Sequence, residues 1–406
     1  MSEMRILWVK AGGLWPLDTG GRLRSFHTIA ELSRRHRVVL LTTHGPKEDP
    51  DELVAQLPYC ERVMSFAHRP PKKGSLRLAG TLIGSWFSEL PVDLWKWRVP
   101  PLRAEVGRLI ASGGVDVCVA DFMMAVPNVA FGGPVPVVLF EHNVEHMIWK
   151  RLAAVETRPW RRLPLEVEWR KMRRFEAKTC RRADLTLAVS EDDRALLARN
   201  APAAKVRAIP TGVDTSYFVP NGHCESSASL VFTGSMDWYP NEDGVLHFVD
   251  SILPIVRREV PAAALTVVGR GPSPRLRETA VAAGVRVTGG VPDIRPYVAE
   301  GAVYVVPLRV GGGTRLKIFE ALAMGKAVVS TTVGAEGLPL VPGEHFLQAD
   351  DPAHFARAVV SLLGDPDRRR ALGTAGRRLV EERYSWSQVA REFESRFKEV
   401  MPHVSH

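Results

Sequence analysis

The segment with the clearest chemical pattern spans residues 303–325. An apolar run at 303–306 reads as a buried strand, three glycines follow at Gly311–Gly313, and a helical pattern begins after them. Free backbone amides at the start of a helix, reached through a glycine loop, form a binding site for phosphate groups. Arg315 and Lys317 lie in the first turn of that helix, where the macrodipole disfavours positive charge. We therefore predict that an anion binds here.

Glu320 follows Lys317 by three residues and shares its helix face. Two interpretations are open. The pair forms an ion pair within the helix, worth about 0.2–0.5 kcal/mol, or the cations Arg315 and Lys317 hold a pyrophosphate while Glu320 accepts hydrogen bonds from a ribose. A glycine loop alone would be weak evidence, but the loop, the cations and the carboxylate together favour ligand binding.

Polar residues also follow the apolar run 137–140 in the first half, at the end of an expected strand, where open α/β sheets place their ligands. His142 and His146 are four residues apart, but the HExxH order is absent and we expect no metal site. The alternative for His142 is a buried, hydrogen-bonded histidine. Gly20 and Gly21 either bring backbone amides close to a ligand or serve as turn glycines.

The elements that position these residues alternate between short apolar runs and longer amphipathic stretches. This alternation predicts an α/β fold with parallel sheets covered on both faces. The linker is expected at 209–214 and the polar stretch 221–227. The expected strands are 6–9, 38–42, 115–120, 135–140 and 185–189 in the first half, and 230–232, 265–268, 285–287, 303–306 and 327–330 in the second.

Length and composition limit the class of protein. A chain of 406 residues is long enough for two domains, and its net charge of +9 favours anionic partners. No segment has the roughly 20 apolar residues of a transmembrane helix, and the first apolar run is too short for a signal peptide. The four cysteines, Cys60, Cys118, Cys180 and Cys224, lie far apart and form no CxxC pair, so we expect neither a zinc site nor a disulfide framework. A reducing compartment fits this pattern, and we expect the protein to be cytoplasmic.

Two stretches of the first half, 70–101 and 150–182, combine basic residues with tryptophans. Such a composition suits a surface that lies at the headgroups of an anionic membrane or holds a bulky acidic acceptor. A solvated helix whose tryptophans face the core is the equally weighted alternative.

Further motifs make the pattern specific. The second half carries Phe232–Met236, Asn241, Pro254, Val267–Pro272, Val287–Asp293 and Gly311–Glu320, and the first half carries Gly20–Gly21, Glu141–Glu145, Ala188–Ser190 and Pro210–Asp214. In the order and spacing of these motifs, the sequence is similar to glycosyltransferase family 4, in a variant group with a GGGTRLKxxEA loop.

This resemblance implies the GT-B fold, in which two facing Rossmann-like domains hold the donor between them. The acceptor-side domain would be 1–209, joined by a crossover helix at 385–406, and the nucleotide-sugar domain would be 210–384. It also implies transfer of a sugar from a nucleoside diphosphate with retention of configuration, without metal or cofactor. The acceptor would be a glycan or a lipid-linked molecule of cell-envelope polysaccharide or glycoconjugate synthesis, with no nucleic acid partner.

The resemblance also implies site residues. Val287–Asp293 would frame the base, Glu320 would hold the ribose, and His142 would lie beside the donor sugar. The expected catalytic residues are His142, Arg315 and Lys317, and the expected donor-binding residues are Gly20, Gly21, Gly234, Gly269, Val291, Gly312, Gly313, Thr314 and Glu320.

The sequence departs from the family pattern at two places. Gly312 stands where many members carry a first glutamate, which leaves the identity of the hexose open. Ser235 and Asn241 stand near the positions of the usual phosphate-binding Arg and Lys. We expect Arg315 and Lys317 to replace those cations.

Two other function classes are weighed against the transferase. A nicotinamide-dependent oxidoreductase would use Gly269–Gly271 as its dinucleotide turn, but GxGxxG is incomplete there and no acidic residue follows at the right distance. A catalytically inactive module that binds sugar nucleotides or nucleic acid would fit the net charge and the missing glutamate. Glu320 and the two cations argue against it.

Overall fold

The computed structural model describes residues 3–17, 19–71, 75–156, 158–220, 225–310 and 316–401. It divides the chain into two compact units. The first unit comprises Met1–Pro210 and Val389–His406, and the second comprises Thr211–Gln388. Each unit has an extended cluster of buried apolar side chains. Among the described residues, no helix is both long enough and apolar enough to cross a membrane.

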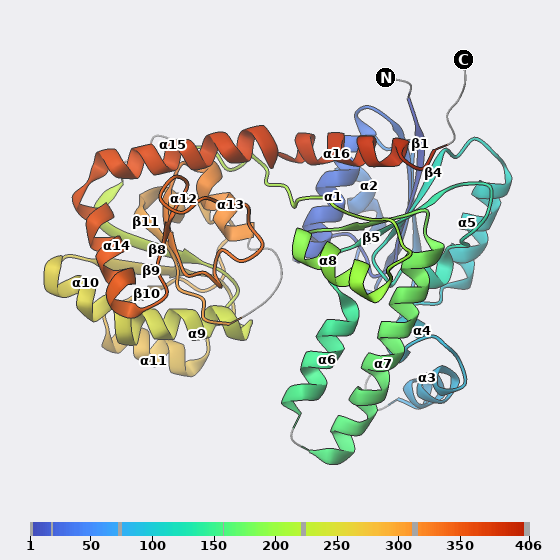
Figure 1. Ribbon diagram of the computed structural model, residues 1–406, viewed down its shortest axis with the longest axis horizontal. Coiled ribbons are helices and arrows are strands. Elements are labelled where there is room, and N and C mark those ends of the chain that lie inside the picture. Colours follow the sequence, from blue (N-terminus) through green and yellow to red (C-terminus); the bar gives the residue numbers. More distant parts are fainter. Residues whose placement is uncertain are drawn as a thin grey trace. The chain divides into compact units, whose positions relative to one another are not determined.

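The first unit is built on a parallel sheet (Figure 1) whose strand order is β3-β2-β1-β4-β5-β6-β7. Its central strands are fully buried because helices cover both faces, as expected for parallel sheets. The strand order reverses between β1 and β4, and such a switch point is where α/β sheets bind ligands. The strands are β1 (Arg5–Lys10), β2 (Arg37–His44), β3 (Arg62–Ala67), β4 (Val117–Asp121), β5 (Val137–Glu141), β6 (Leu185–Ala188) and β7 (Val206–Ala208).

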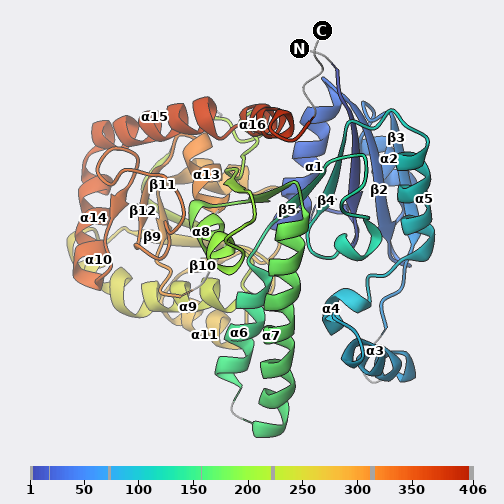
Figure 2. The same cartoon turned by 45° about the vertical axis from the view of Figure 1, so that its right-hand side comes forward.

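Helices of the first unit include a long antiparallel pair, α6 and α7, that extends away from the sheet, with the short α3 and α4 close to α7 (Figures 1 and 2). The helices are α1 (Gly20–Ser33), α2 (Pro50–Gln56), α3 (Leu76–Trp86), α4 (Val92–Trp95), α5 (Pro100–Ala111), the 3-10 turn η1 (Val126–Asn128), α6 (Glu145–Val155), α7 (Pro159–Arg182) and α8 (Glu191–Asn200).

The C-terminal helix α16 (Trp386–Lys398) packs with its second half on the first unit. The Phe393 ring lies 5.9 Å from the Trp8 ring and 4.9 Å from the Phe140 ring, measured between centroids. Buried Glu394 lies 3.3 Å from Nε2 of His36. The second half of α16 therefore contributes to the core of the first unit.

The second unit has a parallel sheet in the order β10-β9-β8-β11-β12-β13, with its switch point between β8 and β11. Asp365 caps α15 by accepting a hydrogen bond from the amide of Arg368. The strands are β8 (Ser226–Thr233), β9 (Ala264–Val268), β10 (Arg286–Val287), β11 (Gly301–Val306), β12 (Ala327–Ser330) and β13 (Leu347–Gln348). The helices are α9 (Tyr239–His247), the π turn η2 (Phe248–Ile252), α10 (Leu253–Glu259), α11 (Pro274–Ala282), α12 (Arg295–Glu300), α13 (Leu316–Ala323), α14 (Pro352–Gly364) and α15 (Pro366–Arg383).

Candidate functional site

In the second unit, the loops after β8 and β9 touch through their backbones. A Cβ atom added to Gly269 would lie 1.7 Å from the carbonyl oxygen of Gly234, so only glycine fits at this contact. The amide of Gly234 donates to the carbonyl of Val268 over 2.9 Å. Gly234 and Gly269 thus lie together at the carboxyl edge of the sheet, beside the switch point.

Lys317 reaches this edge from α13. Its Nζ donates to Oδ1 of Asn241 over 2.7 Å and lies 4.1 Å from the centroid of the Phe232 ring. A Cβ atom added to Gly234 would come within 2.6 Å of Nζ. The half-buried ammonium group therefore lies against the loop after β8, close to Asn241, one of the two residues that stand near the positions of the usual cations.

Glu320 lies one turn further along α13, half-buried. Burial raises the pKa of its carboxyl to about 7, and the charge of Lys317 opposes that rise. The side chain consequently changes its charge near neutral pH. In its ionised form it offers two acceptor oxygens, which is the arrangement that binds a pair of vicinal hydroxyls.

The loop after β10 joins the same cluster. The amide of Gly269 donates to the carbonyl of Gly289 over 3.1 Å. Val291 in this loop is partly buried and packs against the core of the second unit. Among the predicted donor-binding residues, the structure brings Gly234, Gly269 and Val291 to one edge of the sheet, together with α13.

Four predicted residues of the glycine loop, Gly312, Gly313, Thr314 and Arg315, lie outside the described residues. Sequence reasoning missed Arg270, an exposed cation at the same edge, whose Nε donates to Oγ of Ser235 over 3.0 Å. Its position directly after Gly269 was the available signal.

The first unit has a second cluster, around His142 at the end of β5. Nε2 of His142 lies 2.8 Å from Oδ1 of Asp121 at the end of β4, and both side chains are buried. The indole of Trp8 donates to Oδ2 of Asp121 over 2.8 Å, and Lys10 donates to Oδ1 over 3.3 Å. Although burial alone would raise the pKa of Asp121, the charge of Lys10 and the interaction with His142 hold it well below its ordinary value.

These surroundings define the protonation state of His142. Burial lowers the pKa of its imidazole to about 4, outweighing the opposite effect of Asp121, so the ring is neutral at physiological pH. The carboxylate of Asp121 beside Nε2 favours the imidazole tautomer whose proton is on Nε2. Nδ1 is then an acceptor, and it faces Gly21, where an added Cβ atom would lie 3.4 Å away.

Gly20 and Gly21 begin α1, with Thr19 as the capping residue that accepts from the amide of Arg22. The predicted pair therefore lies at a helix N-terminus, where amides and the macrodipole favour negative charge. The contact with His142 brings together the predicted residues of the first unit. They meet close to the switch point between β1 and β4.

Asp121 and Lys10 belong to this His142 cluster and were not predicted. Phe122, which follows Asp121, has φ of 74°, a strained conformation for a bulky residue. Its ring lies edge-on to His142, with centroids 5.1 Å apart. The turn after β4 thus fixes Asp121 on one side of the imidazole and Phe122 on another.

His146 points elsewhere. Its Nδ1 pairs with buried Glu176 on α7, which also accepts from the amide of Glu145 over 2.7 Å. Burial raises the pKa of Glu145 to about 8 and that of Glu141 well above its usual value. The contacts of Glu176 with His146 and with the amide of Glu145 tie α6 to α7, so His146 has a structural role.

The expected absence of a metal site remains a prediction. Within the described ranges, no group of three or more His, Cys, Asp or Glu side chains has an arrangement suited to a metal ion. Cys60, Cys118 and Cys180 are free thiols. Cys224 lies outside the residues that the structure describes.

Comparison with known proteins assigns both halves of the chain. Residues 20–217 match the model of glycosyltransferase family 4, and residues 227–365 match that of glycosyl transferases group 1. A GDP-mannose-dependent alpha-(1-6)-phosphatidylinositol monomannoside mannosyltransferase of Mycobacterium tuberculosis is 30% identical over 47% of this chain and 54% of its own length. The chain thus spans about half the length of this curated relative.

Solved structures resemble the whole chain. Sucrose-phosphate synthase from Thermosynechococcus elongatus has a TM-score of 0.67 at 18% identity and covers 98% of this chain and 99% of its own. The Anabaena protein HepE in complex with UDP has a TM-score of 0.66 at 14% identity, covering 98% and 100%. These similarities concern the fold, which is the two-domain GT-B fold predicted from the sequence.

The oxidoreductase and the inactive binding module are not favoured by these matches. Two glycosyltransferase models thus match in succession, family 4 on the first half of the chain and group 1 on the second, and both support the resemblance to family 4 seen in the sequence.

Proposed function

We propose that this chain transfers a hexosyl group from a nucleoside diphosphate sugar to a glycan or lipid-linked acceptor, with retention of configuration and without a metal ion. The bond between the anomeric carbon and the β-phosphate oxygen breaks, and a bond from that carbon to an acceptor hydroxyl oxygen forms. The hydroxyl proton passes to the leaving diphosphate. Catalysis then rests on positioning and on stabilisation of the departing charge.

The position of Lys317 is the observation that carries the donor assignment. Its ammonium lies beside Gly234 at the switch point of the second sheet, with Arg270 at the same edge. Glycine-limited loops and cations at such an edge suit a diphosphate. We assign Glu320, one turn away, to the ribose, whose hydroxyl groups would donate to its carboxylate.

The state of His142 supports a role in positioning. A neutral imidazole with a pKa of about 4 is a poor proton donor at neutral pH, but its Nδ1 accepts a hydrogen bond well. We assign it to a hydroxyl of the donor sugar. The acceptor proton then leaves with the diphosphate rather than on His142.

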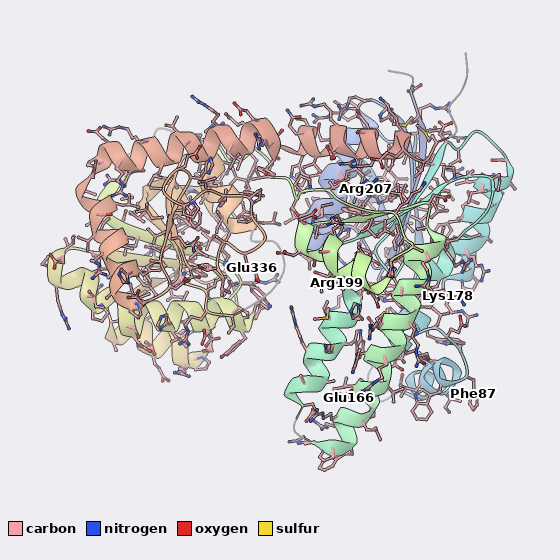
Figure 3. The ribbon with its side chains drawn as sticks, in the orientation of Figure 1. Phe87, Glu166, Lys178, Arg199, Arg207 and Glu336 are labelled. Atoms are coloured by element: carbon pink, nitrogen blue, oxygen red, sulfur yellow. The ribbon has the colours of Figure 1, made fainter. Side chains whose placement is uncertain are left out.

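A location at the cytoplasmic face of the cell membrane, in cell-envelope polysaccharide or glycoconjugate synthesis, completes the proposal. Large apolar side chains are exposed on α3 and near the start of α7: Trp86 is 66% exposed, Trp160 is 72% exposed, and Phe87, next to α3, is 90% exposed. Phe87 is labelled in Figure 3. Such side chains next to basic residues suit a membrane surface.

A thermal-shift screen tests the donor assignment, because a ligand that binds only the folded chain raises its Tm. The screen uses UDP, GDP and their sugars, including GDP-mannose, the donor in the name of the mannosyltransferase relative. We expect one sugar nucleotide to raise the Tm of the native chain and of Glu278→Ala, an exposed control on α11, but not of Glu320→Ala. Equal shifts in Glu320→Ala would contradict the assignment.

Vesicle sedimentation tests the membrane contact separately. Vesicles with phosphatidylglycerol should retain the native chain, and the double variant Phe87→Ser/Trp160→Ser should be released. Tyr239→Ser removes an exposed aromatic ring from the second unit and should have no effect. Unchanged retention of the double variant would refute this part of the proposal.

A further inference from the structure

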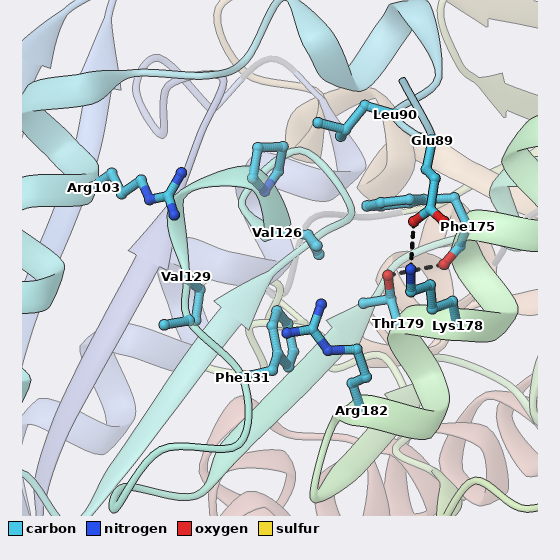
Figure 4. A pocket seen from close by; sticks show the side chains of 12 residues that line it. Glu89, Leu90, Arg103, Val126, Val129, Phe131, Phe175, Lys178, Thr179 and Arg182 are labelled. Atoms are coloured by element: carbon cyan, nitrogen blue, oxygen red, sulfur yellow. Dashed lines mark hydrogen bonds and ion pairs between the residues drawn. The ribbon is translucent and has the colours of Figure 1, made fainter. Parts of the chain in front are cut away.

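Two cavities in the first unit border the ion pair between Glu89 and Lys178, away from the residues around His142. The first, of about 280 Å³, lies between α5, η1 and α7 (Figure 4), and the second, of about 480 Å³, follows α7 toward its start. Phe175 lines both cavities. We call this pair of cavities the α7 groove.

The charge of the α7 groove is strongly positive. Arg170, Arg174, Lys178 and Arg182 are exposed and recur every four residues along one face of α7. Arg103 and Lys171 add two further cations, and Glu89 is the acidic residue among the lining side chains described. This arrangement suits a ligand with at least one phosphate.

The floor of the α7 groove is apolar. Phe131 and Phe175 are partly buried and pack against the core of the first unit, and Val126 and Val129 line the same cavity. The guanidinium of Arg182 lies 5.4 Å from the centroid of the Phe131 ring (Figure 4). A cation held over an aromatic floor joins an anion-binding and an apolar surface at one place.

We infer that the α7 groove binds an amphiphile in which a phosphate is joined to a hydrocarbon chain. The phosphate lies on Arg174, Lys178 and Arg182, and the chain lies against Phe131 and Phe175. This inference deepens the proposed function, on which it rests, by giving the lipid-linked acceptor a phosphate and a place. A free inorganic phosphate would leave the aromatic floor unused, and an uncharged lipid would leave the cations unused.

Isothermal titration with decyl phosphate, below its micellar concentration, tests the inference. Decyl maltoside supplies the chain without the phosphate, and inorganic phosphate supplies the anion without the chain. We expect decyl phosphate to bind the native chain more than about tenfold tighter than either control. The double variant Arg174→Ala/Arg182→Ala should lose about tenfold in affinity, whereas Arg181→Ala, an adjacent exposed arginine that does not line the groove, should bind as the native chain does.

Equal binding of decyl phosphate and decyl maltoside, or an equal loss in Arg181→Ala, would overturn the inference. Equal binding of inorganic phosphate would overturn the assignment of a lipid. Because no sugar nucleotide is present, the result does not depend on transfer. A chain that transfers sugar to a soluble acceptor but does not bind decyl phosphate would refute the groove alone, and a chain that binds decyl phosphate but no sugar nucleotide would refute the proposed function alone.

Discussion

Replacing Lys317 with methionine removes one positive charge from α13 and keeps an unbranched side chain against the Phe232 ring. In the native chain, the ammonium lies 4.1 Å from the centroid of that ring and donates to Asn241 over 2.7 Å. The loop after β8 is otherwise maintained by the backbone contact between Gly234 and Gly269. The change should therefore affect the bound diphosphate much more than the fold.

The expected magnitude follows from a half-buried, charge-assisted hydrogen bond. Such a bond contributes about 1.5–3 kcal/mol, which corresponds to a rise in Kd of about 10- to 150-fold. The free energy of unfolding should change by less than about 1 kcal/mol, because the methionine stem retains the apolar contact. Screening at the partly exposed site favours the lower part of the affinity range.

The assay is calorimetric titration of UDP and GDP into the native chain, Lys317→Met and the control Arg275→Ala, an exposed cation on α11. The nucleotide that binds the native chain should bind Arg275→Ala equally and Lys317→Met at least about tenfold more weakly. An unchanged Kd in Lys317→Met would refute the reasoning that this lysine replaces the missing cations of the family pattern. Urea unfolding of the same samples shows whether the fold is retained.

Three further predictions concern protonation and packing. His142 should titrate near pH 4 by NMR, and a midpoint near 6.5 would contradict this. The imidazole of the unfolded chain binds a proton near pH 6.5, before that of the folded chain. The free energy of unfolding should therefore fall as the pH is lowered from 6.5 to 4. The carboxyl of Glu320, with a pKa of about 7, ionises as pH rises, so the affinity for a nucleoside diphosphate should rise by up to about tenfold between pH 6 and 8. A 2′,3′-dideoxy analogue lacks the ribose hydroxyls and should not gain affinity. An equal gain for this analogue would refute a ribose contact. Gly269→Ala should cost more than about 3 kcal/mol in urea unfolding, because its Cβ would meet the carbonyl of Gly234. Gly107→Ala, whose Cβ meets nothing in α5, should stabilise by about 0.5–1 kcal/mol, and similar effects of the two changes would argue against the close contact.

Much of the fold was predictable because buried parallel strands are continuous apolar runs. Strands β1, β4, β5, β8 and β11 all overlap predicted runs, although β8 begins four residues before its predicted start. β3 was missed because it lies at the sheet edge and is only half-buried, so its pattern is weak. β7 has three residues, with an exposed Arg207 in the middle, and gives no periodic signal.

The candidate sites were predictable where a local pattern carried the chemistry. Lys317 and Glu320 share a helix face by spacing alone, and His142 follows an apolar run. Asp121, by contrast, lies 21 positions before His142 and reaches it only because β4 and β5 are neighbours in the sheet. Its partnership with Lys10 likewise depends on strand order, which the sequence does not state.

The α7 groove shows the same limit. The repeat of arginine and lysine every four residues was visible in the basic stretch 150–182, but a solvated helix has the same pattern. The cavity depends on Phe131 and Arg103, which come from other elements. Only packing in three dimensions distinguishes a binding groove from a solvated face.

The most direct test of the central claim is the release of nucleoside diphosphate from sugar nucleotides in the presence of decyl phosphate-linked and free glycan acceptors. The native chain should release nucleoside diphosphate from one sugar nucleotide and form a glycosylated product in equal amount. Glu320→Ala and His142→Ala should both lose most of this activity while unfolding cooperatively. Release at the native rate in Glu320→Ala, or no product from any sugar nucleotide, would contradict the account.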